Sequence, residues 1–157
     1  MKVDFTVKNA PSYKVAYILR YGPYAGQDTW RSELTQIERW AKRNRIRTGK
    51  WIVYFIDKWT AKSQKKRRSI AAIEIKGKGK PQAKIRLMKI PRQKVVSVTF
   101  DPNNISADLV YLGIEGWLEE SRTYTQTTRS REVYNGNPWT NPNAWANCEV
   151  QVPIRRK

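Results

Sequence analysis

The chain has 157 residues, which suffices for one domain with a buried core, and its seven Trp and eight Tyr among 39% hydrophobic residues exclude a disordered protein. It has no His and a single Cys, which excludes the usual zinc and iron sites, an internal disulfide and His-based acid–base catalysis; no metal and no cofactor are expected. Its formal net charge of +18 favours anionic partners. No apolar run reaches the length of a membrane span and residues 1–4 lack the order of a signal peptide, so a cytoplasmic location without a membrane partner is predicted.

The first half of the chain predicts the order strand, strand, helix, strand, strand. Strands are predicted over residues 3–7, where apolar residues alternate, and over residues 13–21, 51–57 and 69–76. The strand at residues 51–57 is apolar on both faces, which predicts a central strand covered on both sides. The helix between the second and third strands begins at Asp28 or Thr29, either of which can cap it. Its apolar stripe runs from Trp30 through Ile37 to Ala41, so Trp30 is expected in the core.

The second half returns to the same order after a short linker of alternating Gly and Lys. The predicted strands cover residues 84–90, 93–100, 132–134 and 148–154. The second helix spans Ser106–Glu120, and its spacing predicts that Leu109, Leu112 and Gly116 or Trp117 face the core.

The last strand offers a candidate ligand site. It alternates with period two, so Glu149 lies on the face opposite its apolar residues. Tyr134, Trp139 and Trp145 precede it closely, and a carboxylate among aromatic rings forms the wall of a pocket for a flat, apolar guest, neutral or cationic. The alternative is that Glu149 is a solvent-facing strand residue.

The order of elements is the same in both halves, which indicates an internal duplication with pseudo-repeats 1–80 and 81–157 in a single domain. The segments that carry a family resemblance are Tyr17-Ile18 through Gly22-Pro23-Tyr24, Trp40-Ala41, Val53-Tyr54, Lys89-Ile90-Pro91, Trp117-Leu118, Val133-Tyr134-Asn135 with Pro138, and residues 149–154. Together they resemble the GyrI-like small-molecule-binding domain, the effector-binding module of AraC-type and MerR-type multidrug regulators, in a stand-alone form. The resemblance implies an α+β fold: a duplicated β-α-β-β module with a curved antiparallel sheet of about eight strands, two long helices and a pocket between the halves.

The resemblance also implies which residues line that pocket. In the family a glutamate on the last strand, matched by Glu149, faces the ligand, and tyrosines and tryptophans stack on the guest. Asp101-Pro102-Asn103 stands where relatives repeat Gly-Pro-Tyr, and Ile70 stands where many carry an acidic residue, so the pocket is expected to hold one carboxylate. The expected ligand-binding residues are Glu149, Tyr54, Tyr134, Trp117, Trp145, Tyr24 and Tyr111.

Three functions fit these features, and whether the chain is an enzyme stays open. The first is binding of a small lipophilic aromatic molecule, for sensing, sequestration or detoxification. The chain leaves no room for a DNA-reading domain, so a complete regulator is not expected. The second, which the resemblance implies, is hydrolysis of strained cyclopropane-type alkylators: Glu149, made more basic by burial, activates water, and Tyr54 or Tyr134 stabilises the oxygen that gains charge.

The third function uses the basic middle of the chain. Residues 39–94 hold 20 Lys and Arg but 2 Asp and Glu, whereas the remainder holds 11 of each sign. Such a surface suits nucleic acid or an acidic protein; the alternative is a solvated face that keeps the protein soluble. The candidate nucleic-acid-binding residues are Lys65, Lys66, Arg67, Arg68, Lys78 and Lys80. The oligomeric state stays open.

Overall fold

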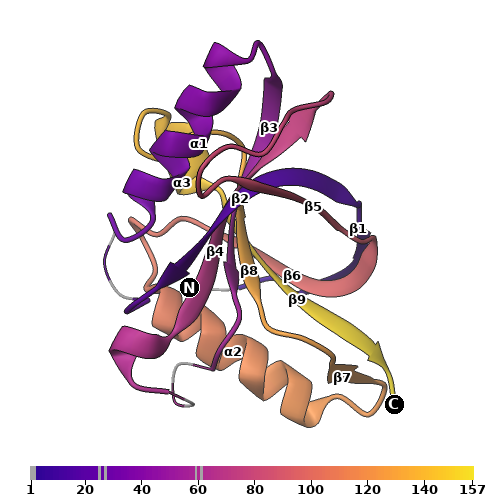
Figure 1. Cartoon of the computed structure of the whole chain (residues 1–157). Helices are drawn as coiled ribbons and strands as arrows, with labels where there is room; N and C mark the ends of the chain where they lie inside the picture. Colours follow the sequence, from indigo (N-terminus) through magenta and orange to yellow (C-terminus); the bar gives the residue numbers. More distant parts are fainter. Residues whose placement is uncertain (1–2, 25, 27, 59, 61) are drawn as a thin grey trace. The chain divides into compact units, whose positions relative to one another are not determined.

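The computed structural model describes residues 3–24, 26, 28–58, 60 and 62–157 of the chain (Figure 1). The chain forms two compact units. Unit 1 comprises the N-terminal segment up to Pro11 together with residues 92–157, and unit 2 comprises residues 12–91. None of the helices in the described part of the chain is both long and apolar enough to cross a membrane.

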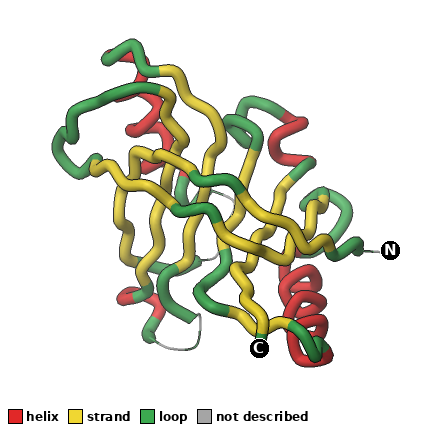
Figure 2. The backbone as a smooth tube through the Cα atoms, turned by 90° about the vertical axis from the view of Figure 1, so that its right-hand side faces the viewer, coloured by secondary structure: helices red, strands yellow, loops and turns green. Residues whose placement is uncertain are grey.

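Unit 2 is an antiparallel sheet with one long helix packed on it (Figure 2). Its strands, in order across the sheet, are β3 (Arg47–Phe55), β4 (Arg68–Lys76), β2 (Tyr13–Tyr21) and β5 (Arg86–Ile90). Helix α1 (Arg31–Arg43) packs on the sheet because Leu34, Ile37 and Trp40 recur at helical spacing and are buried. A short 3₁₀ turn, η1 (Gln64–Lys66), precedes β4.

Unit 1 has its own antiparallel strands and two helices. The strand order is β1 (Thr6–Ala10), β6 (Gln93–Phe100), β9 (Cys148–Arg156) and β8 (Arg131–Tyr134), and β7 (Tyr124–Gln126) also pairs with β9. The helices are α2 (Ala107–Glu120) and the short α3 (Pro142–Ala146). Ser106 caps α2, because its hydroxyl accepts a hydrogen bond from the Asp108 amide at 3.3 Å. Helix α2 contacts β6 and β7.

The predicted α+β class and the repeated order of elements are confirmed. The order β1-β2-α1-β3-β4 returns as β5-β6-α2-β8-β9, with β7 and α3 as additions in the second half. Strands β2 and β6 have the predicted bounds. Strand β1 pairs with β6, and β5 pairs with β2. The first strand of the first repeat therefore belongs to unit 1, which consists mostly of the second repeat, and the first strand of the second repeat belongs to unit 2, which consists mostly of the first repeat.

Three local predictions are wrong. Strand β1 begins at Thr6 rather than at residue 3, because its pairing with β6 covers Thr6 to Ala10. Strand β3 begins at Arg47, so Gly49 lies inside the strand instead of before it. The N-cap of α1 is Trp30, without a side-chain capping bond, and neither predicted cap serves; the Thr29 hydroxyl donates to a backbone carbonyl at 2.8 Å instead.

The inward face of α2 also differs from the prediction. Val110 and Ile114 are buried, whereas the predicted core residues Leu109 and Leu112 are 60% and 62% exposed. The helix is therefore rotated by roughly one residue, about 100°, from the expected orientation. The reason is that α2 carries two neighbouring apolar stripes, and a 3.6-residue period does not tell which of them faces the core.

Candidate functional site

A carboxylate held by two phenols lies on the side of the β8–β9 pair that faces α2. Glu132 on β8 accepts a hydrogen bond from the Tyr111 hydroxyl of α2 at 2.6 Å and another from the Tyr134 hydroxyl at 3.0 Å. Glu132 and Tyr134 are two residues apart, so they share one face of the strand. The register places Glu132 opposite the buried Val150 of β9. The carboxylate therefore has two neutral donors and an apolar neighbour.

An aromatic stack borders this carboxylate. Trp145 of α3 stacks on Tyr134, with ring centroids 6.4 Å apart and planes inclined by 3°. The Trp145 indole donates a hydrogen bond to the Asn103 side chain at 3.1 Å, which orients the ring. Tyr134 is 8% exposed, whereas Trp145 and Glu132 keep partial exposure. We call Tyr111, Glu132, Tyr134 and Trp145 the Glu132 cluster.

Burial dominates the electrostatics of the Glu132 cluster. Burial raises the pKa of Glu132 above its ordinary value, although the hydrogen bonds from Tyr111 and Tyr134 oppose this rise. Burial also raises the pKa of both tyrosines, and the adjacent carboxylate adds to the effect. The pKa of the neighbouring Cys148 thiol rises for the same two reasons, which disfavours its thiolate form.

The Glu132 carboxylate differs from the other shifted carboxylates in its charged neighbours. Within the described residues, no Lys or Arg nitrogen lies within 4.0 Å of it. The same residues include no group of three His, Cys, Asp or Glu side chains placed to hold a metal ion. The Glu132 cluster therefore offers a carboxylate, two phenols and an indole face, which is a set of groups suited to an organic guest.

Glu149, the carboxylate singled out from the sequence, lies in a different environment. It forms an ion pair with Lys8 at 2.6 Å and accepts a hydrogen bond from the Ser97 hydroxyl at 2.6 Å. Burial acts to raise the pKa of Glu149, but the bonds from Lys8 and Ser97 outweigh it and leave the pKa below its ordinary value. The expectation that burial makes Glu149 more basic is therefore wrong.

Trp117 belongs to a separate aromatic stack in unit 1. Its ring lies 6.3 Å from that of Phe5 and 6.2 Å from that of Tyr124, with planes inclined by 19° and 15°. The Lys94 ammonium lies 5.7 Å from the centroid of Tyr124. Tyr54 lies on β3 of unit 2 and is partly exposed. The predicted ligand-binding residues that unit 1 brings together are Tyr111, Tyr134 and Trp145.

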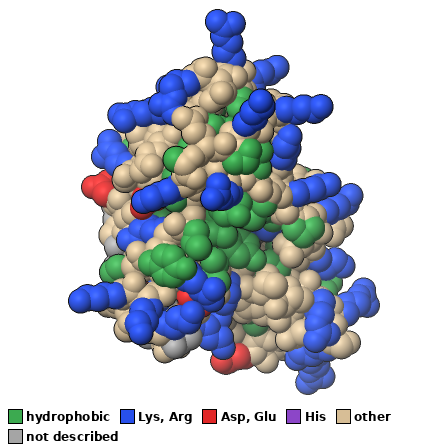
Figure 3. All heavy atoms as spheres, viewed as in Figure 1, with side chains coloured by type: hydrophobic (Ala, Val, Ile, Leu, Met, Phe, Trp, Pro, Cys, Tyr) green, Lys and Arg blue, Asp and Glu red, His purple; other side chains and the backbone are tan. Residues whose placement is uncertain are grey.

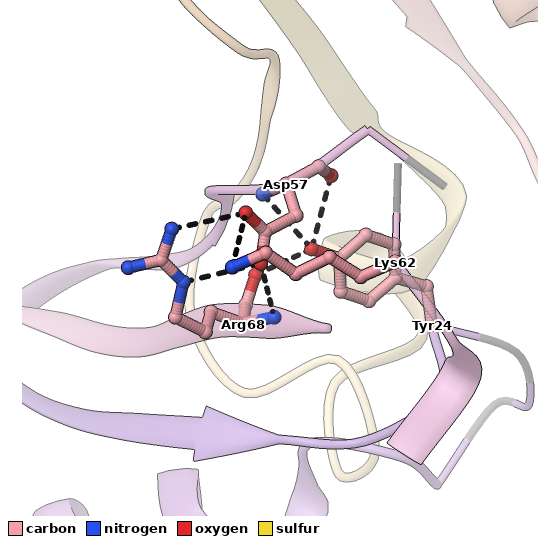
Figure 4. Close-up of polar contacts among 4 residues, drawn as sticks. All are labelled: Tyr24, Asp57, Lys62 and Arg68. Carbon is pink, nitrogen blue, oxygen red and sulfur yellow. Dashed lines mark hydrogen bonds and ion pairs between the residues drawn. The ribbon is translucent and has the colours of Figure 1, made fainter. Parts of the chain in front are cut away.

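Tyr24 takes part in a polar cluster in unit 2 (Figure 4). Its hydroxyl donates to the backbone carbonyls of Asp57, at 3.1 Å, and of Arg68. The Asp57 carboxylate accepts hydrogen bonds from the Arg68 guanidinium at 3.0 and 3.1 Å and pairs with Lys62 at 3.4 Å. The hydrogen bonds from the Arg68 side chain hold the pKa of Asp57 well below its ordinary value. Arg68, predicted to contact nucleic acid, is thus bound to a carboxylate of its own unit.

The other predicted nucleic-acid-binding residues lie in two connections of unit 2. Lys65 and Lys66 are exposed on η1, and Arg67 beside them is partly buried. Lys78 and Lys80 are exposed between β4 and β5.

Glu132 was missed as a site residue, although the sequence contains a signal for it. It precedes Tyr134 by two residues in a predicted strand, and that spacing alone puts the carboxylate and the phenol on one face. The contact with Tyr111 carries no comparable signal, because it joins a helix and a strand that lie 21 positions apart.

Several solved structures share the fold of this chain. The C-terminal domain of EcmrR is 17% identical, with a TM-score of 0.82 and complete coverage of both chains. In an EcmrR–DNA complex the identity is 18% and the TM-score 0.81, over 99% of this chain and 58% of that chain, so the chain spans a little over half of EcmrR. A hydrolase encoded by lin2189 from Listeria innocua is 7% identical, with a TM-score of 0.65, over 96% of this chain and 91% of its own.

A fourth structure, SAV2435 bound to tetraphenylphosphonium, is 9% identical, with a TM-score of 0.51, over 97% of this chain and 94% of its own. At these identities the likeness shows a shared fold alone. No curated protein sequence matches the chain. Residues 4–155 match the GyrI-like family, described as a small molecule binding domain. With nearly the whole chain matched and the fold shared, this protein belongs to the GyrI-like family of small-molecule-binding domains.

Proposed function

We propose that the Glu132 cluster binds a lipophilic aromatic cation. The observation that carries the proposal is a carboxylate whose pKa is raised by burial and which has no Lys or Arg partner among the described residues. A cationic guest supplies the missing positive charge. Two unit charges 4 Å apart attract by about 4 kcal/mol at the effective dielectric constant of about 20 found near protein surfaces, against about 1 kcal/mol in water.

The other carboxylates with shifted pKa values provide the contrast. Glu149 is paired with Lys8 at 2.6 Å, and Asp57 is paired with Arg68 at 3.0 Å. Both are already neutralised by side chains of the chain itself, so both suit a structural role. Glu132 is the carboxylate of this group that can still form an ion pair with an external cation.

The aromatic stack favours an aromatic guest. A cation over a Trp or Tyr ring gains about 0.5 to 2 kcal/mol, depending on how far water is excluded. The partly exposed Trp145 presents such a ring beside the carboxylate, and Tyr134 supports it from below at 6.4 Å. The family's description as a small molecule binding domain and the tetraphenylphosphonium bound to SAV2435, which has a related fold, agree with this choice of guest.

The test is a titration with tetraphenylphosphonium, followed by tryptophan fluorescence and by calorimetry. We expect Glu132→Gln to weaken binding about 10- to 100-fold, which corresponds to about 1.4 to 2.7 kcal/mol. The matched control is Glu149→Gln, which removes one carboxylate from the same unit and should leave the affinity unchanged. An unchanged affinity in Glu132→Gln, or an equal loss in both variants, would show that the cation binds elsewhere.

A neutral probe separates charge from shape. Triphenylphosphine oxide has similar aromatic bulk without the net charge. The unmodified protein should bind it more weakly than it binds tetraphenylphosphonium. The affinity for the oxide should be the same in Glu132→Gln as in the unmodified protein. If the neutral compound binds the unmodified protein as tightly as the cation, the carboxylate does not select for charge.

Hydrolysis is a second candidate function. The raised pKa of Glu132 suits a base that takes a proton from water. Once Glu132 is protonated, a phenol that donated to it, Tyr111 or Tyr134, can donate to the oxygen that gains negative charge instead. A hydrolase from Listeria innocua also shares the fold. The test is turnover of a strained cyclopropane-bearing alkylator. Turnover that disappears in Glu132→Gln supports the second function, and its absence in the unmodified protein excludes it for that substrate.

A further inference from the structure

A cationic groove lies on unit 2, remote in sequence from the Glu132 cluster. It is an open groove with a volume of about 390 Å³, within the size range of small-molecule sites. One wall is the polar side of α1, and the other is the tight turn at residues 82–85 that precedes β5. Its polar lining consists of Gln36, Arg39, Arg43, Gln82 and Lys84.

Local structure accounts for the shape of the groove. Gln36, Arg39 and Arg43 are three and four residues apart, so they form one row on α1. Two reciprocal backbone hydrogen bonds between Gln82 and Ile85, at 2.9 and 3.3 Å, close the opposite turn. The connection that carries this turn packs closely on the helix at Gly79, where a Cβ atom would lie 2.8 Å from the Trp40 ring. Both walls are therefore held by the packing of unit 2.

The groove is lined by positively charged side chains. Arg39, Arg43 and Lys84 are exposed, and none of them has a carboxylate within 4.0 Å among the described residues. The two glutamine amides add further N–H donors. Three cations and two amides that face one cavity suit an anion with several oxygen atoms, such as a phosphate group.

The positive charge continues beyond the groove. Residues 39–47 and 76–86 together hold ten Lys and Arg and no Asp or Glu. The two segments are neighbours: Arg47 pairs directly with Lys76 across β3 and β4, a like-charge pair that destabilises a sheet. In Figure 3, Lys and Arg side chains project from the upper part of the molecule, where α1 ends and β3 begins. We call residues 39–47 and 76–86 the basic track. Ten positive charges in two neighbouring segments suit a polyanion better than a single small anion.

We infer that this track binds the phosphodiester backbone of nucleic acid, with Arg39, Arg43 and Lys84 gripping phosphates in the groove. Binding is independent of base sequence, because Trp40 is the one aromatic residue in the two segments and it is fully buried, so no ring is offered for base stacking. This site differs from the predicted cluster at residues 65–68, where Arg68 is engaged by Asp57.

The experiment measures the affinity of a fluorescent 20-base-pair duplex for the full chain between 50 and 200 mM salt. The test variant is Arg39→Gln, Arg43→Gln and Lys84→Gln combined. The matched control removes the same charge from exposed positions of unit 1 through Arg122→Gln, Arg155→Gln and Arg156→Gln. The logarithm of the binding constant falls as the logarithm of the salt concentration rises. Each lost phosphate contact makes this slope less steep by about 0.9, so the loss of three contacts makes it less steep by about 2.7. Because the salt concentration changes fourfold, the affinity advantage of the unmodified protein over the test variant should shrink by about 40-fold across the range.

The outcomes separate the groove from charge in general. A reduced slope in the test variant, with the control close to the unmodified protein, supports the proposal. Equal losses in both variants would assign binding to net charge and overturn it. Binding of inorganic phosphate without binding of the duplex would make the groove a small-anion site and would overturn it as well. Circular dichroism and thermal melting of each variant establish that a loss does not come from misfolding.

Discussion

The hydrogen bond from Tyr111 to Glu132 predicts a shift in the pH dependence of cation binding. The proposed function requires the ionised carboxylate, so the affinity for a cation should fall as the pH drops through the pKa of Glu132, which burial raises above its ordinary value. The 2.6 Å bond from the Tyr111 hydroxyl favours the ionised form. The Tyr111→Phe variant loses this bond, so its Glu132 holds the proton up to a higher pH.

The size of the shift follows from the strength of the bond. Hydrogen bonds to charged groups contribute about 1.5 to 3 kcal/mol, and the lower end applies because Glu132 keeps partial exposure. One pH unit corresponds to about 1.4 kcal/mol, so the midpoint of the affinity profile should rise by about one unit in Tyr111→Phe.

The assay is calorimetry with tetraphenylphosphonium at pH values from 4 to 9. At a pH between the two midpoints, binding to Tyr111→Phe should release more protons than binding to the unmodified protein, which two buffers of different ionisation enthalpy reveal. The matched control is Tyr124→Phe, whose ring stacks on Trp117 in a different part of unit 1 and whose profile should not move. Coincident profiles for Tyr111→Phe and the unmodified protein would refute the assignment of the titration to Glu132.

Two further predictions concern stability. Gly79→Ala places a methyl group 2.8 Å from the Trp40 ring, so it should lower the free energy of unfolding, measured by urea denaturation, by about 1 to 3 kcal/mol. The control is Gly116→Ala in α2, where the new Cβ meets no atom within 4 Å, and this variant should be as stable as the unmodified protein or more stable. A destabilised Gly116→Ala, or an unaffected Gly79→Ala, would contradict this packing. Asp57→Asn should destabilise the protein at neutral pH, because hydrogen bonds from Arg68 lower the pKa of Asp57 in the folded state. This contribution to stability is fully present above the unfolded pKa of about 3.9 and is lost as the pH falls towards the lower pKa of the folded state. Thermal melting from pH 7 to pH 2 should therefore show the two proteins converging in acid, and a constant difference would exclude Asp57 as the cause.

Much of the fold could be predicted because its signals are local. Strand β2 has the predicted limits, since Tyr13, Val15 and Ile18 are buried within a strongly β-forming stretch bounded by proline and glycine. Helix α2 ends at Glu120 as predicted, and Ser106 directly precedes its first residue, Ala107. The face of α2 could not be predicted, because residues distant in sequence decide which of two apolar stripes is covered.

The site was harder to predict because strand register is not a local property. The last strand shows Glu149 opposite an apolar face, and this pattern alone gives no sign that Lys8 and Ser97 bind its carboxylate. In the structure Glu149 of β9 pairs with Thr99 of β6, and Val150 of β9 pairs with Glu132 of β8. Glu132 thus lies on the face that appeared purely apolar when β9 was considered alone. A one-residue change of register would have exchanged the two environments.

The three carboxylates with shifted pKa values differ in their counterions. The chain carries 31 Lys and Arg against 13 Asp and Glu, so cations are abundant near most carboxylates. Asp57 and Glu149 have both acquired a cationic partner, and their pKa values are lowered. Glu132 has phenols in place of such a partner within the described residues, and its pKa is raised. Burial of the Glu132 carboxylate without a Lys or Arg partner among the described residues carries a desolvation penalty, which the proposed cationic guest would offset.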